Sequence, residues 1–348
     1  MVGASDAVYR MEPSTARCPA CHATQSVVLY TVRAEEAAQH YVRRETDPDR
    51  HDALRAHIGV LWGAEAADVM RCTACGFGFA HPYVAGDESF YTLAYERTSY
   101  PDWKWEYEQT LGVLRSLQAG FDEPPALLEV GAGDGAFVKR VAPSLTPKER
   151  VVCTEYSAYG RREIERYGIE CLDRDVRDLP LDTYGGRFDV ICLFQVLEHL
   201  DRLDALFEHL GALAAVRGHL FLAVPNDQRI AFNERSGALL DLPPNHIGRW
   251  TREAFEAIAG RHGWRIEAHE IEPEGPRAKA ANFAEFRYMR VRQSAGALAQ
   301  RAERLPQPIR RPAQAALAVA YALGRPRALA ELVRTPGLGN HQWVHLSR

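Results

Sequence analysis

The sequence lacks the features that define several classes of protein. It has 348 residues but only seven cysteines, too few for a disulfide scaffold. No apolar run reaches the ~18–20 residues that a membrane-spanning helix needs, and the best candidate, residues 313–323, is short and flanked by prolines. The N-terminal segment has no hydrophobic stretch of the kind found in secretory signals. We therefore expect a cytoplasmic protein that does not enter a membrane and keeps its cysteines reduced.

The overall charge gives little sign of a nucleic-acid partner. Apolar residues make up 46% of the chain and charged residues 25%, as in ordinary globular proteins, and the length suits two domains. The formal charge of −4 hides an asymmetry, because residues 273–348 carry thirteen Lys or Arg against four Asp or Glu, a net charge of +9. The first 272 residues therefore carry −13. The basic segment could meet an anionic group on a substrate, although a solvated arginine-rich face is the simpler interpretation.

From residue 121 onward, short β-type runs alternate with helical stretches, which predicts a parallel sheet with crossover helices. The predicted strands are 126–130, 150–154, 170–172, 188–194, 219–224, 264–271 and 342–346. The predicted helices are 136–141, 158–167, 203–215 and 252–262, preceded by one at 105–118. Two further helical stretches, 278–303 and 312–333, form an insertion before the last strand. The first 85 residues read as a separate small module, with one helical stretch at 34–55.

A glycine-rich turn is the sharpest local signal. The segment Gly131–Gly135 follows a predicted strand that carries Glu129, and it precedes a helix. Glycines allow a positive φ and close approach of a ligand to the backbone, and a helix N-terminus offers unpaired N–H groups. Glu155 ends the next strand, where a carboxylate can accept both ribose hydroxyls of an adenosine. Asp175 follows the third strand, where it could reach an adenine amino group beside Val176. The alternatives are that Glu155 is a surface acid and Asp175 a turn residue.

These segments together resemble class I S-adenosylmethionine-dependent methyltransferases. The resemblance rests on residues 129–137, Glu155, and residues 175–181 and 188–200, and it extends over about residues 121–271 plus the final strand. It implies an α/β, Rossmann-like fold with a seven-stranded sheet in the order 3-2-1-4-5-7-6, the last strand antiparallel. It also implies S-adenosyl-L-methionine as the cofactor. A nicotinamide dehydrogenase is the rival, because Ala136 completes a G-x-G-x-x-A pattern, but Glu129 and residues 196–200 do not belong to that pattern.

The resemblance assigns a role to each matching position. The glycines border the methionine part of the cofactor, Glu155 holds the ribose, Asp175 and Val176 hold the adenine, and two residues after strand four lie beside the cofactor. An aromatic stretch at 86–120 is expected to close over it or to form a seam against the N-terminal module. The expected cofactor-binding residues are Tyr91, Tyr95, Glu129, Gly131, Gly133, Asp134, Gly135, Phe137, Glu155, Tyr156, Asp175, Val176, Gln195 and Val196.

Two CxxC pairs indicate a metal site in the N-terminal module. Cys18 and Cys21 form one pair, Cys72 and Cys75 the other, and each pair can present two thiolates to one tetrahedral zinc ion. Four thiolates leave no open coordination position, so the zinc is expected to be structural. The alternatives are unrelated free cysteines or a redox dithiol. Three other cysteines, Cys153, Cys171 and Cys192, fall on predicted strands and are expected to be core residues.

Two histidines are candidates for a catalytic base. His199 follows the fourth strand, and His246 lies in a loop after the fifth, at the sheet edge where ligands bind in such folds. Either could instead be a structural histidine. In the quinone-biosynthesis branch of the family, the matching segment carries metal-ligating acids and a histidine. This sequence has Glu198 and His199 but Gln195 in place of the first acid, which argues against a second metal.

The sequence therefore predicts a two-module enzyme with a zinc-ribbon-like domain at residues 1–85, a linker and cofactor-capping helix at 86–120, and a methyltransferase domain at 121–348 with a helical insertion at 273–338. The cysteine module resembles the N-terminal zinc-binding segment of methyltransferases that modify sugars, sugar nucleotides and other small biosynthetic molecules. This resemblance implies methyl transfer to an O, N or C atom of a small polar biosynthetic substrate, such as a sugar, a sugar nucleotide or a natural-product intermediate. The substrate can be anionic, and the protein is expected to be a monomer or homodimer. The alternatives are an RNA- or protein-modifying methyltransferase, and a protein that binds S-adenosylmethionine for another reaction.

Overall fold

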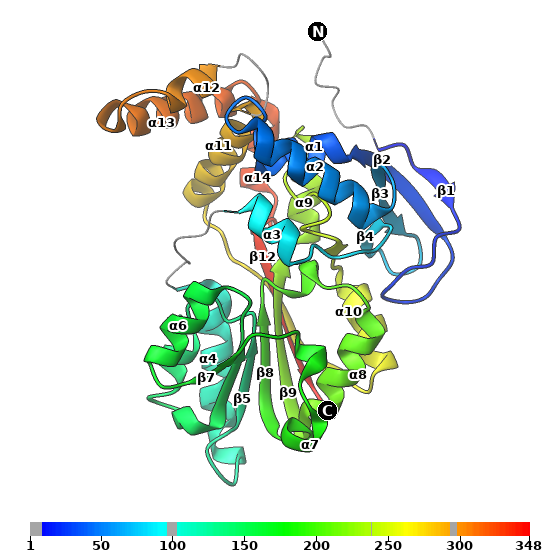
Figure 1. The fold of residues 1–348 in the computed structure, drawn as a ribbon, viewed down its shortest axis with the longest axis vertical. Helices are drawn as coiled ribbons and strands as arrows, with labels where there is room; N and C mark the ends of the chain where they lie inside the picture. The colour runs from blue at the N-terminus through cyan, green and yellow to red at the C-terminus, as the bar shows by residue number, and fades with distance from the viewer. Residues whose placement is uncertain (1–8, 96–102, 238, 293–297) are drawn as a thin grey trace.

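The computed structural model describes residues 9–95, 103–237, 239–292 and 298–348. Its centre is a seven-stranded sheet in the order β11-β12-β9-β8-β5-β6-β7, which in chain order of these strands reads 6-7-5-4-1-2-3. The last strand, β12, is antiparallel to both of its neighbours, whereas β5 to β9 pair in parallel (Figure 1). The strands are β5 (Leu127–Val130), β6 (Val151–Thr154), β7 (Glu170–Leu172), β8 (Phe188–Phe194), β9 (Ala214–Pro225), β11 (Arg265–Ile271) and β12 (His341–Ser347).

Helices cover both faces of this sheet, as the near-continuous apolar strands require. Within β8, Ile191 and Leu193 join one buried cluster, and Val190 and Cys192 join the other, because alternate side chains point to opposite faces. Cys153 and Cys171 are buried as well, so the expectation of core cysteines is confirmed. The covering helices are α4 (Trp105–Leu117), α5 (Val138–Val141), α6 (Ala158–Arg166), α7 (Leu181–Tyr184), α8 (Leu203–Leu213) and α10 (Arg252–Arg261), with 3-10 turns η1 (Gln118–Gly120), η2 (Lys148–Arg150), η3 (Val176–Asp178) and η4 (Leu197–His199). Helix α9 (Asp227–Arg235) follows β9 and lies beyond the end of the sheet, where its Phe232 packs with the insertion (Figure 1).

The N-terminal module is built on a second, antiparallel sheet in the order β1-β2-β3-β4-β10. Its strands are β1 (Glu12–Ser14), β2 (Ser26–Arg33), β3 (Ala66–Cys72), β4 (Gly78–His81) and β10 (Gly248–Arg249). The single helical stretch expected at 34–55 is wrong: there are two helices, α1 (Ala34–Tyr41) and α2 (Pro48–Trp62), because Asp47 caps a new helix with Pro48 in its first turn. A further helix, α3 (Glu88–Ala94), follows the sheet.

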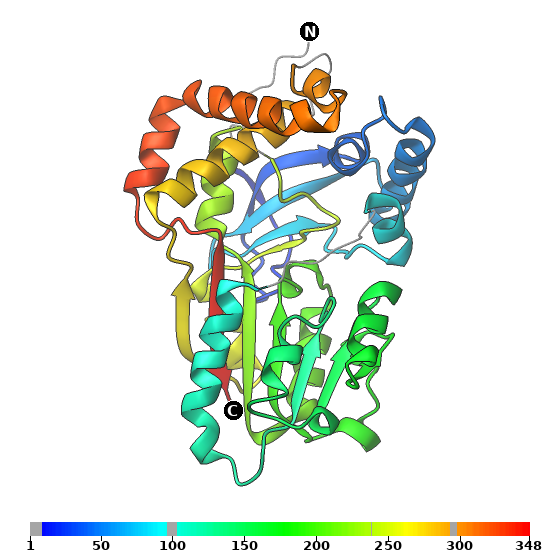
Figure 2. The same cartoon turned by 90° about the vertical axis from the view of Figure 1, so that its left-hand side faces the viewer.

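The two modules share one hydrophobic core. Strand β10 comes from the methyltransferase-like part of the chain but pairs with β4 of the N-terminal sheet. Phe77 packs against Trp250 with ring centroids 4.7 Å apart, and both belong to the cluster that contains Leu222 of the central sheet. The N-terminal module therefore lies firmly over the edge of the central sheet (Figures 1 and 2).

Four helices form the insertion before β12: α11 (Pro276–Arg292), α12 (Leu298–Glu303), α13 (Gln307–Leu323) and α14 (Pro326–Arg334). The stretch expected at 312–333 is two helices rather than one, and α13 begins before Pro312 and contains it. Helix α11 packs against α13 and α14, and α13 lies along the outer surface of the molecule in both views (Figures 1 and 2). Among the described residues, no helix combines the length and apolar character needed to cross a membrane.

Candidate functional site

The glycine turn lies at the carboxyl end of β5, in the middle of the central sheet. Gly131, Gly133 and Gly135 all have positive φ, at 65°, 59° and 81°. A Cβ atom on Gly131 would stand 2.6 Å from Cγ2 of Val196, so only glycine fits there. The turn is held by the Gly131 N–H, which donates to the Thr154 carbonyl at 2.8 Å. The backbone of the turn is therefore fixed to the end of β6 and packed closely against Val196.

Glu155 points at this turn from the end of the neighbouring strand. Its Oε2 accepts a hydrogen bond from the Gly133 N–H at 2.8 Å, and its Oε1 accepts one from the Ser157 N–H at 2.7 Å. These two donors fix the direction of the carboxylate. The parallel pairing of β5 and β6 brings the two strand ends together. Glu155, 24 positions after Gly131 in the chain, therefore lies beside the glycine turn.

Three acids near the turn, the buried Glu106 and Glu129 and the half-buried Asp134, each keep an oxygen atom without a partner in the described part of the chain. Glu129, Asp134 and Glu106 each have one buried carboxylate oxygen that makes no hydrogen bond among the described residues. Burial raises the pKa of Glu129 to about 8, because the charged form is poorly solvated there. Glu106, at the start of α4, is fully buried and accepts a hydrogen bond from Gln195 Nε2 at 3.3 Å. A cation that entered this space would find unpaired carboxylate oxygens on several sides.

Sequence reasoning missed Glu106. It lies among the tryptophans and tyrosines of residues 103–107, which give an aromatic packing signal and no acidic motif. Its helix also positions Tyr107, whose ring packs against Phe137 and Phe194 at 5.4 and 5.0 Å. The structure thus places Phe137, expected beside the cofactor, in a fully buried aromatic cluster beneath the turn.

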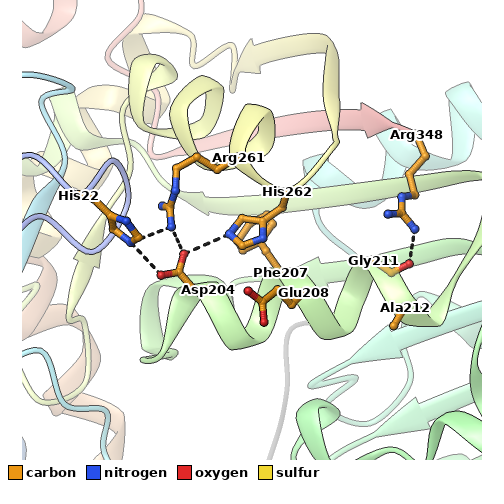
Figure 3. Close-up of a pocket in the computed structure, with 9 residues that line it drawn as sticks. All are labelled: His22, Asp204, Phe207, Glu208, Gly211, Ala212, Arg261, His262 and Arg348. Atoms are coloured by element: carbon orange, nitrogen blue, oxygen red, sulfur yellow. Dashed lines mark hydrogen bonds and ion pairs between the residues drawn. The ribbon is translucent and has the colours of Figure 1, made fainter.

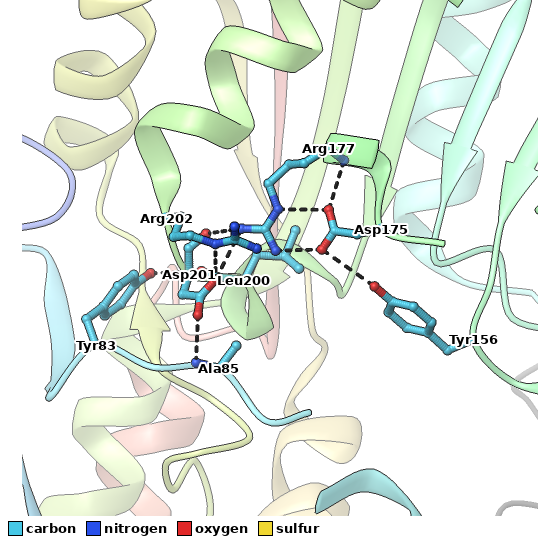
Figure 4. A network of polar contacts seen from close by, with 8 residues as sticks. All are labelled: Tyr83, Ala85, Tyr156, Asp175, Arg177, Leu200, Asp201 and Arg202. Atoms are coloured by element: carbon cyan, nitrogen blue, oxygen red, sulfur yellow. Dashed lines mark hydrogen bonds and ion pairs between the residues drawn. The ribbon is translucent and has the colours of Figure 1, made fainter. Parts of the chain in front are cut away.

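The expected adenine side of the site is organised by an arginine. Asp175 caps η3 and accepts from Arg177 at 2.5 Å and 2.8 Å, and Arg177 also donates to Asp201 (Figure 4). Burial raises the pKa of Asp175, but the Arg177 guanidinium outweighs this and holds the pKa below its ordinary value. Tyr156 reaches Asp175 at 3.5 Å from an exposed position, and Val176 is buried. Asp175 is therefore a charged, oriented group at the end of β7.

The segment after β8 connects the turn to the two candidate histidines. Gln195 has a positive φ of 59°, and Val196 closes against Gly131, as described above. The next residues form η4, and there the Glu198 carbonyl accepts from the Ile247 N–H at 2.9 Å. This bond holds the loop that carries His246 against the loop that carries His199.

Glu198, His199 and His246 form one cluster. Their ligand atoms lie within 4.8 Å of one another, and the two imidazole centroids are 4.8 Å apart. Each histidine is oriented through Nδ1: that of His199 lies 2.7 Å from the Asn245 carbonyl, and that of His246 lies 2.8 Å from Asp241 Oδ1. An oxygen atom therefore fixes Nδ1 of each ring, and in a neutral ring with its proton on Nδ1 the basic nitrogen is Nε2. The arrangement could move a proton, and it has the ligand types of a three-ligand metal site.

Two groups of this cluster, Glu198 and His246, have pKa values above their ordinary values. Burial raises the pKa of Glu198 to about 7, and its Oε2 makes no hydrogen bond among the described residues. Burial lowers the pKa of His246, but the hydrogen bond and charge of Asp241 outweigh it and hold the pKa above its ordinary value. Asp241 was not predicted from the sequence, because a single acid in a loop of prolines carries no motif.

Tyr91 and Tyr95 lie on the side of the histidines, away from the glycine turn. They stack at 6.2 Å, and the Tyr91 ring meets His199 edge-on at 6.3 Å. Both rings pack on the core of the N-terminal module, where Tyr41 contacts Tyr95. These contacts make α3 a wall of the histidine cluster, and they also form the aromatic seam that was the alternative expectation.

The four cysteines of the CxxC pairs converge as expected. The sulfur atoms of Cys18 and Cys75 are 3.7 Å apart, and those of Cys21 and Cys72 are 3.5 Å apart. A tetrahedral zinc ion with bonds of ~2.3 Å needs sulfur–sulfur distances of about 3.8 Å. The two knuckles match each other, since the residue after each pair, His22 or Gly76, has positive φ and donates its N–H back to the first cysteine carbonyl. The cluster therefore has the geometry of a structural zinc site.

A surface hollow of about 710 Å³ lies between this cysteine cluster and helices α8 and α10. There Asp204 accepts from His22, Arg261 and His262, so its charge is satisfied (Figure 3). None of the described residues that line the hollow has a buried polar atom without a partner. We interpret this group of polar contacts as a structural link between the two modules and not as the reaction site.

Comparison with known proteins finds a methyltransferase domain in this chain. Residues 105–269 match the family model of a methyltransferase domain. This range contains the glycine turn, Glu106 and Glu155, together with both histidines. The protein is therefore an enzyme, a methyltransferase. No curated protein matches the chain significantly.

Several solved structures have a related architecture. A SAM-dependent methyltransferase from Archaeoglobus fulgidus is 14% identical, with 70% of this chain and 94% of that chain covered and a TM-score of 0.44. Magnesium protoporphyrin IX methyltransferase from Synechocystis, with bound SAH, is 19% identical (52% and 84% covered, TM-score 0.38). Geranyl diphosphate C-methyltransferase from Streptomyces coelicolor is 12% identical (69% and 79% covered, TM-score 0.40). At these TM-scores the similarities add nothing to the interpretation of the site.

Proposed function

We propose that this protein is an S-adenosyl-L-methionine-dependent methyltransferase that acts on an O, N or C atom of a small polar biosynthetic substrate in the cytoplasm. A sugar, a sugar nucleotide or a natural-product intermediate fits this description. The observation that carries the proposal is the group of carboxylates near the glycine turn, in which Glu129, Asp134 and Glu106 each have a buried oxygen without a partner among the described residues. Buried carboxylates are stable only when they are protonated or meet a positive charge. S-adenosylmethionine carries two such charges, an ammonium and a sulfonium.

The residues of the turn fit each part of this cofactor. The backbone of Gly131–Gly135 and the acids Glu129 and Asp134 would hold the methionine part of the cofactor. Glu155 would accept the ribose hydroxyls, because its carboxylate already lies at the mouth of the turn. Asp175, Tyr156 and Val176 would border the adenine, and Gln195 and Val196 would pack beside the sulfur. When bound, S-adenosylmethionine supplies a methyl group that is already activated by the sulfonium.

The chain's own contribution to methyl transfer is to orient the acceptor and remove its proton. His246 is held through Nδ1 by Asp241 and belongs to one cluster with His199 and Glu198, so in the neutral ring the basic nitrogen is Nε2. A base in this position can take a proton from an acceptor hydroxyl, ammonium or acidic carbon as the methyl group transfers. The aromatic wall of Tyr91 and Tyr95 would exclude water from the same side. The polar character of the cluster is what favours a polar acceptor.

The cysteine cluster fits a structural zinc ion that is separate from the reaction. Cys18, Cys21, Cys72 and Cys75 would be its four ligands, and three of these side chains are buried. The ion would supply no chemistry to the acceptor. It would hold β3 and β4 in the position from which β4 pairs with β10.

The test of the proposed function is calorimetric titration with S-adenosylmethionine. Wild-type protein is expected to bind it, and Glu155→Ala is expected to weaken binding by roughly 100-fold or more, because two hydrogen bonds to a charged group are lost. Glu165→Ala, an exposed acid on α6, is the matched control and should leave the affinity unchanged. Absence of binding to the wild type would refute the function, and unchanged affinity in Glu155→Ala would refute the ribose assignment.

A second prediction concerns protons. Glu129, with a pKa of about 8, is mostly protonated at pH 7, and a cation bound beside it favours the ionised form. Binding should therefore release close to one proton at pH 7, and the affinity should rise with pH up to about 8 and then level off. Calorimetry in two buffers with different ionisation enthalpies counts the protons. Glu129→Gln should abolish the release, and a wild-type protein that releases none would contradict the placement of the ammonium.

A further inference from the structure

The helix α13 turns its apolar side to solvent. Ten of its residues are exposed, and only Gln307 and Arg311 among them are polar. The large exposed side chains are Ile309, Val319 and Leu323, with 57%, 54% and 63% of their surface accessible. An ordinary surface helix has the opposite arrangement, with its polar side outward. In the part of the chain that the structure describes, the outward apolar side of α13 is thus open to a partner.

Small side chains of α13 pack on its neighbours, and Gln314 hydrogen-bonds Tyr288 of α11. Ala318 and Ala322 pack with the cluster of Phe232, Phe283 and Leu332. Eight apolar residues remain on the outer side: Pro308, Ile309, Pro312, Ala315, Ala316, Val319, Ala320 and Leu323. Since α13 lies along the outer surface of the molecule, a flat partner could reach its full length (Figure 2).

The charges around this helix decide which partner it suits. Residues 304–330 contain five arginines and no acidic residue. Arg304 and Arg311 are exposed near the N-terminal end of α13, and Arg325 and Arg327 are exposed just beyond its C-terminal end. In an antiparallel pair of two copies, each basic end would meet the basic end of the other copy, with no acid in the segment to pair. An anionic surface is attracted to both ends at once.

We propose that α13 docks this enzyme on the surface of an anionic lipid bilayer. The helix would lie in the plane of the interface. Its apolar side would enter the boundary between the headgroups and the acyl chains, and its flanking arginines would contact the lipid phosphates. Its 17 residues span about 25 Å, less than the ~30 Å of a hydrocarbon core, so the helix lies on the membrane and does not cross it. This inference goes beyond the proposed methyl transfer and is independent of it.

The experiment is co-sedimentation with vesicles, using the full-length protein. One set of vesicles is pure phosphatidylcholine, and the other is an equal mixture of phosphatidylcholine and phosphatidylglycerol. We expect binding to the anionic vesicles, little binding to the neutral ones, and loss of binding as salt rises from about 0.05 M to about 0.5 M. Arg304→Glu/Arg311→Glu should weaken binding roughly 25-fold or more, at about fivefold for each arginine lost.

A second variant tests the apolar side. Val319→Ser/Leu323→Ser should weaken binding at least tenfold, because two buried apolar side chains are lost from the interface. Val216→Ser/Arg217→Glu makes the same kinds of change at an exposed site at the start of β9, at the other end of the central sheet, and should bind as the wild type does. Thermal melting verifies that each variant is folded.

Three results would overturn the docking proposal. The first is equal binding to neutral and anionic vesicles, and the second is binding to neither. The third is a wild-type dimer in sedimentation velocity that Val319→Ser/Leu323→Ser converts to a monomer, which would assign the apolar side to a second copy. Since none of these measurements uses S-adenosylmethionine, they fail or succeed separately from the proposed function.

Discussion

Replacing Cys72 with serine is expected to reduce the zinc content from one ion per chain to well under one and to lower the melting temperature by about 10 °C or more. Structural zinc contributes ~10–16 kcal/mol in small zinc-binding modules, and losing even a third of that is a large part of a protein's stability. About 2–4 °C is lost per kcal/mol in domains of this size. Metal analysis by mass spectrometry and thermal melting measure the two effects.

The loss should extend to the histidine cluster. Cys72 ends β3, and β4, which follows it, holds the other side of the module: the Ala80 N–H donates to the Ile247 carbonyl at 2.9 Å, next to His246. Arg249, in β10, pairs with Glu234 of α9 at 2.8 Å and donates to the Tyr30 hydroxyl of β2, which ties the N-terminal sheet to α9. A disordered zinc knuckle would therefore loosen the loop that orients His246.

Cys171→Ser is the matched control, because Cys171 is a buried cysteine of the central sheet far from the CxxC pairs in sequence. It should keep one zinc per chain and melt close to the wild type. Purified wild-type protein with well under one equivalent of zinc would contradict the metal assignment, as would a Cys72→Ser protein that retains its zinc.

The sequence could predict those parts of the site that follow from local patterns on neighbouring strands. The Gly131–Gly135 turn, Glu155 and Asp175 follow three consecutive strands, and parallel pairing brings consecutive strand ends to one edge. The four cysteines were predictable for a different reason. A tetrahedral thiolate site needs both CxxC pairs, however many residues separate them along the chain.

The rest of the site depends on long-range packing that no short motif encodes. Glu106 reaches Gln195 only because α4 lies across the sheet, 89 residues away in the chain. Asp241 is recognisable as the partner of His246 only once the loop has folded back on η4. Strand β10 has two residues and joins the N-terminal sheet by pairing with β4, so neither its presence nor its partner could be inferred from residues 248–249 alone.

In the insertion, the sequence did not reveal which side chains of α13 are exposed to solvent. Its basic character was evident from composition, and the simpler interpretation was a solvated arginine-rich face. The structure exposes many of these arginines, and it also exposes the apolar residues of α13 between two clusters of arginine. Which side of an alanine-rich helix faces inward is decided by what it packs on, here α11 and α14, and periodicity in such a sequence does not reveal it.

Replacing His246 with alanine is expected to lower kcat for methyl transfer by about 10²–10⁴-fold while leaving the affinity for S-adenosylmethionine unchanged. The reason is that Asp241 holds His246 on the proposed acceptor side of the site, and no hydrogen bond among the described residues joins His246 to the glycine turn. The rate is measured as S-adenosylhomocysteine formed with the best acceptor in a panel of sugar nucleotides and polar biosynthetic intermediates. His57→Ala removes a histidine that also pairs with an aspartate, Asp87, but on the N-terminal module, and should leave kcat unchanged.

The pH dependence distinguishes a base from a structural histidine. A base must be neutral to accept a proton, and Asp241 holds the pKa of His246 above its ordinary value, so the wild-type rate should rise with pH through that raised pKa and then level off. Asp241→Asn removes the negative charge, which should lower the pKa of His246 and move the rising limb to lower pH, while the plateau rate falls because the ring is less well oriented. NMR titration of the histidine ring protons follows the same pKa without an acceptor. Two results would assign His246 a structural role and leave His199 as the base. One is a His246→Ala protein whose rate falls only because it binds the cofactor more weakly, and the other is a pH profile that Asp241→Asn does not move.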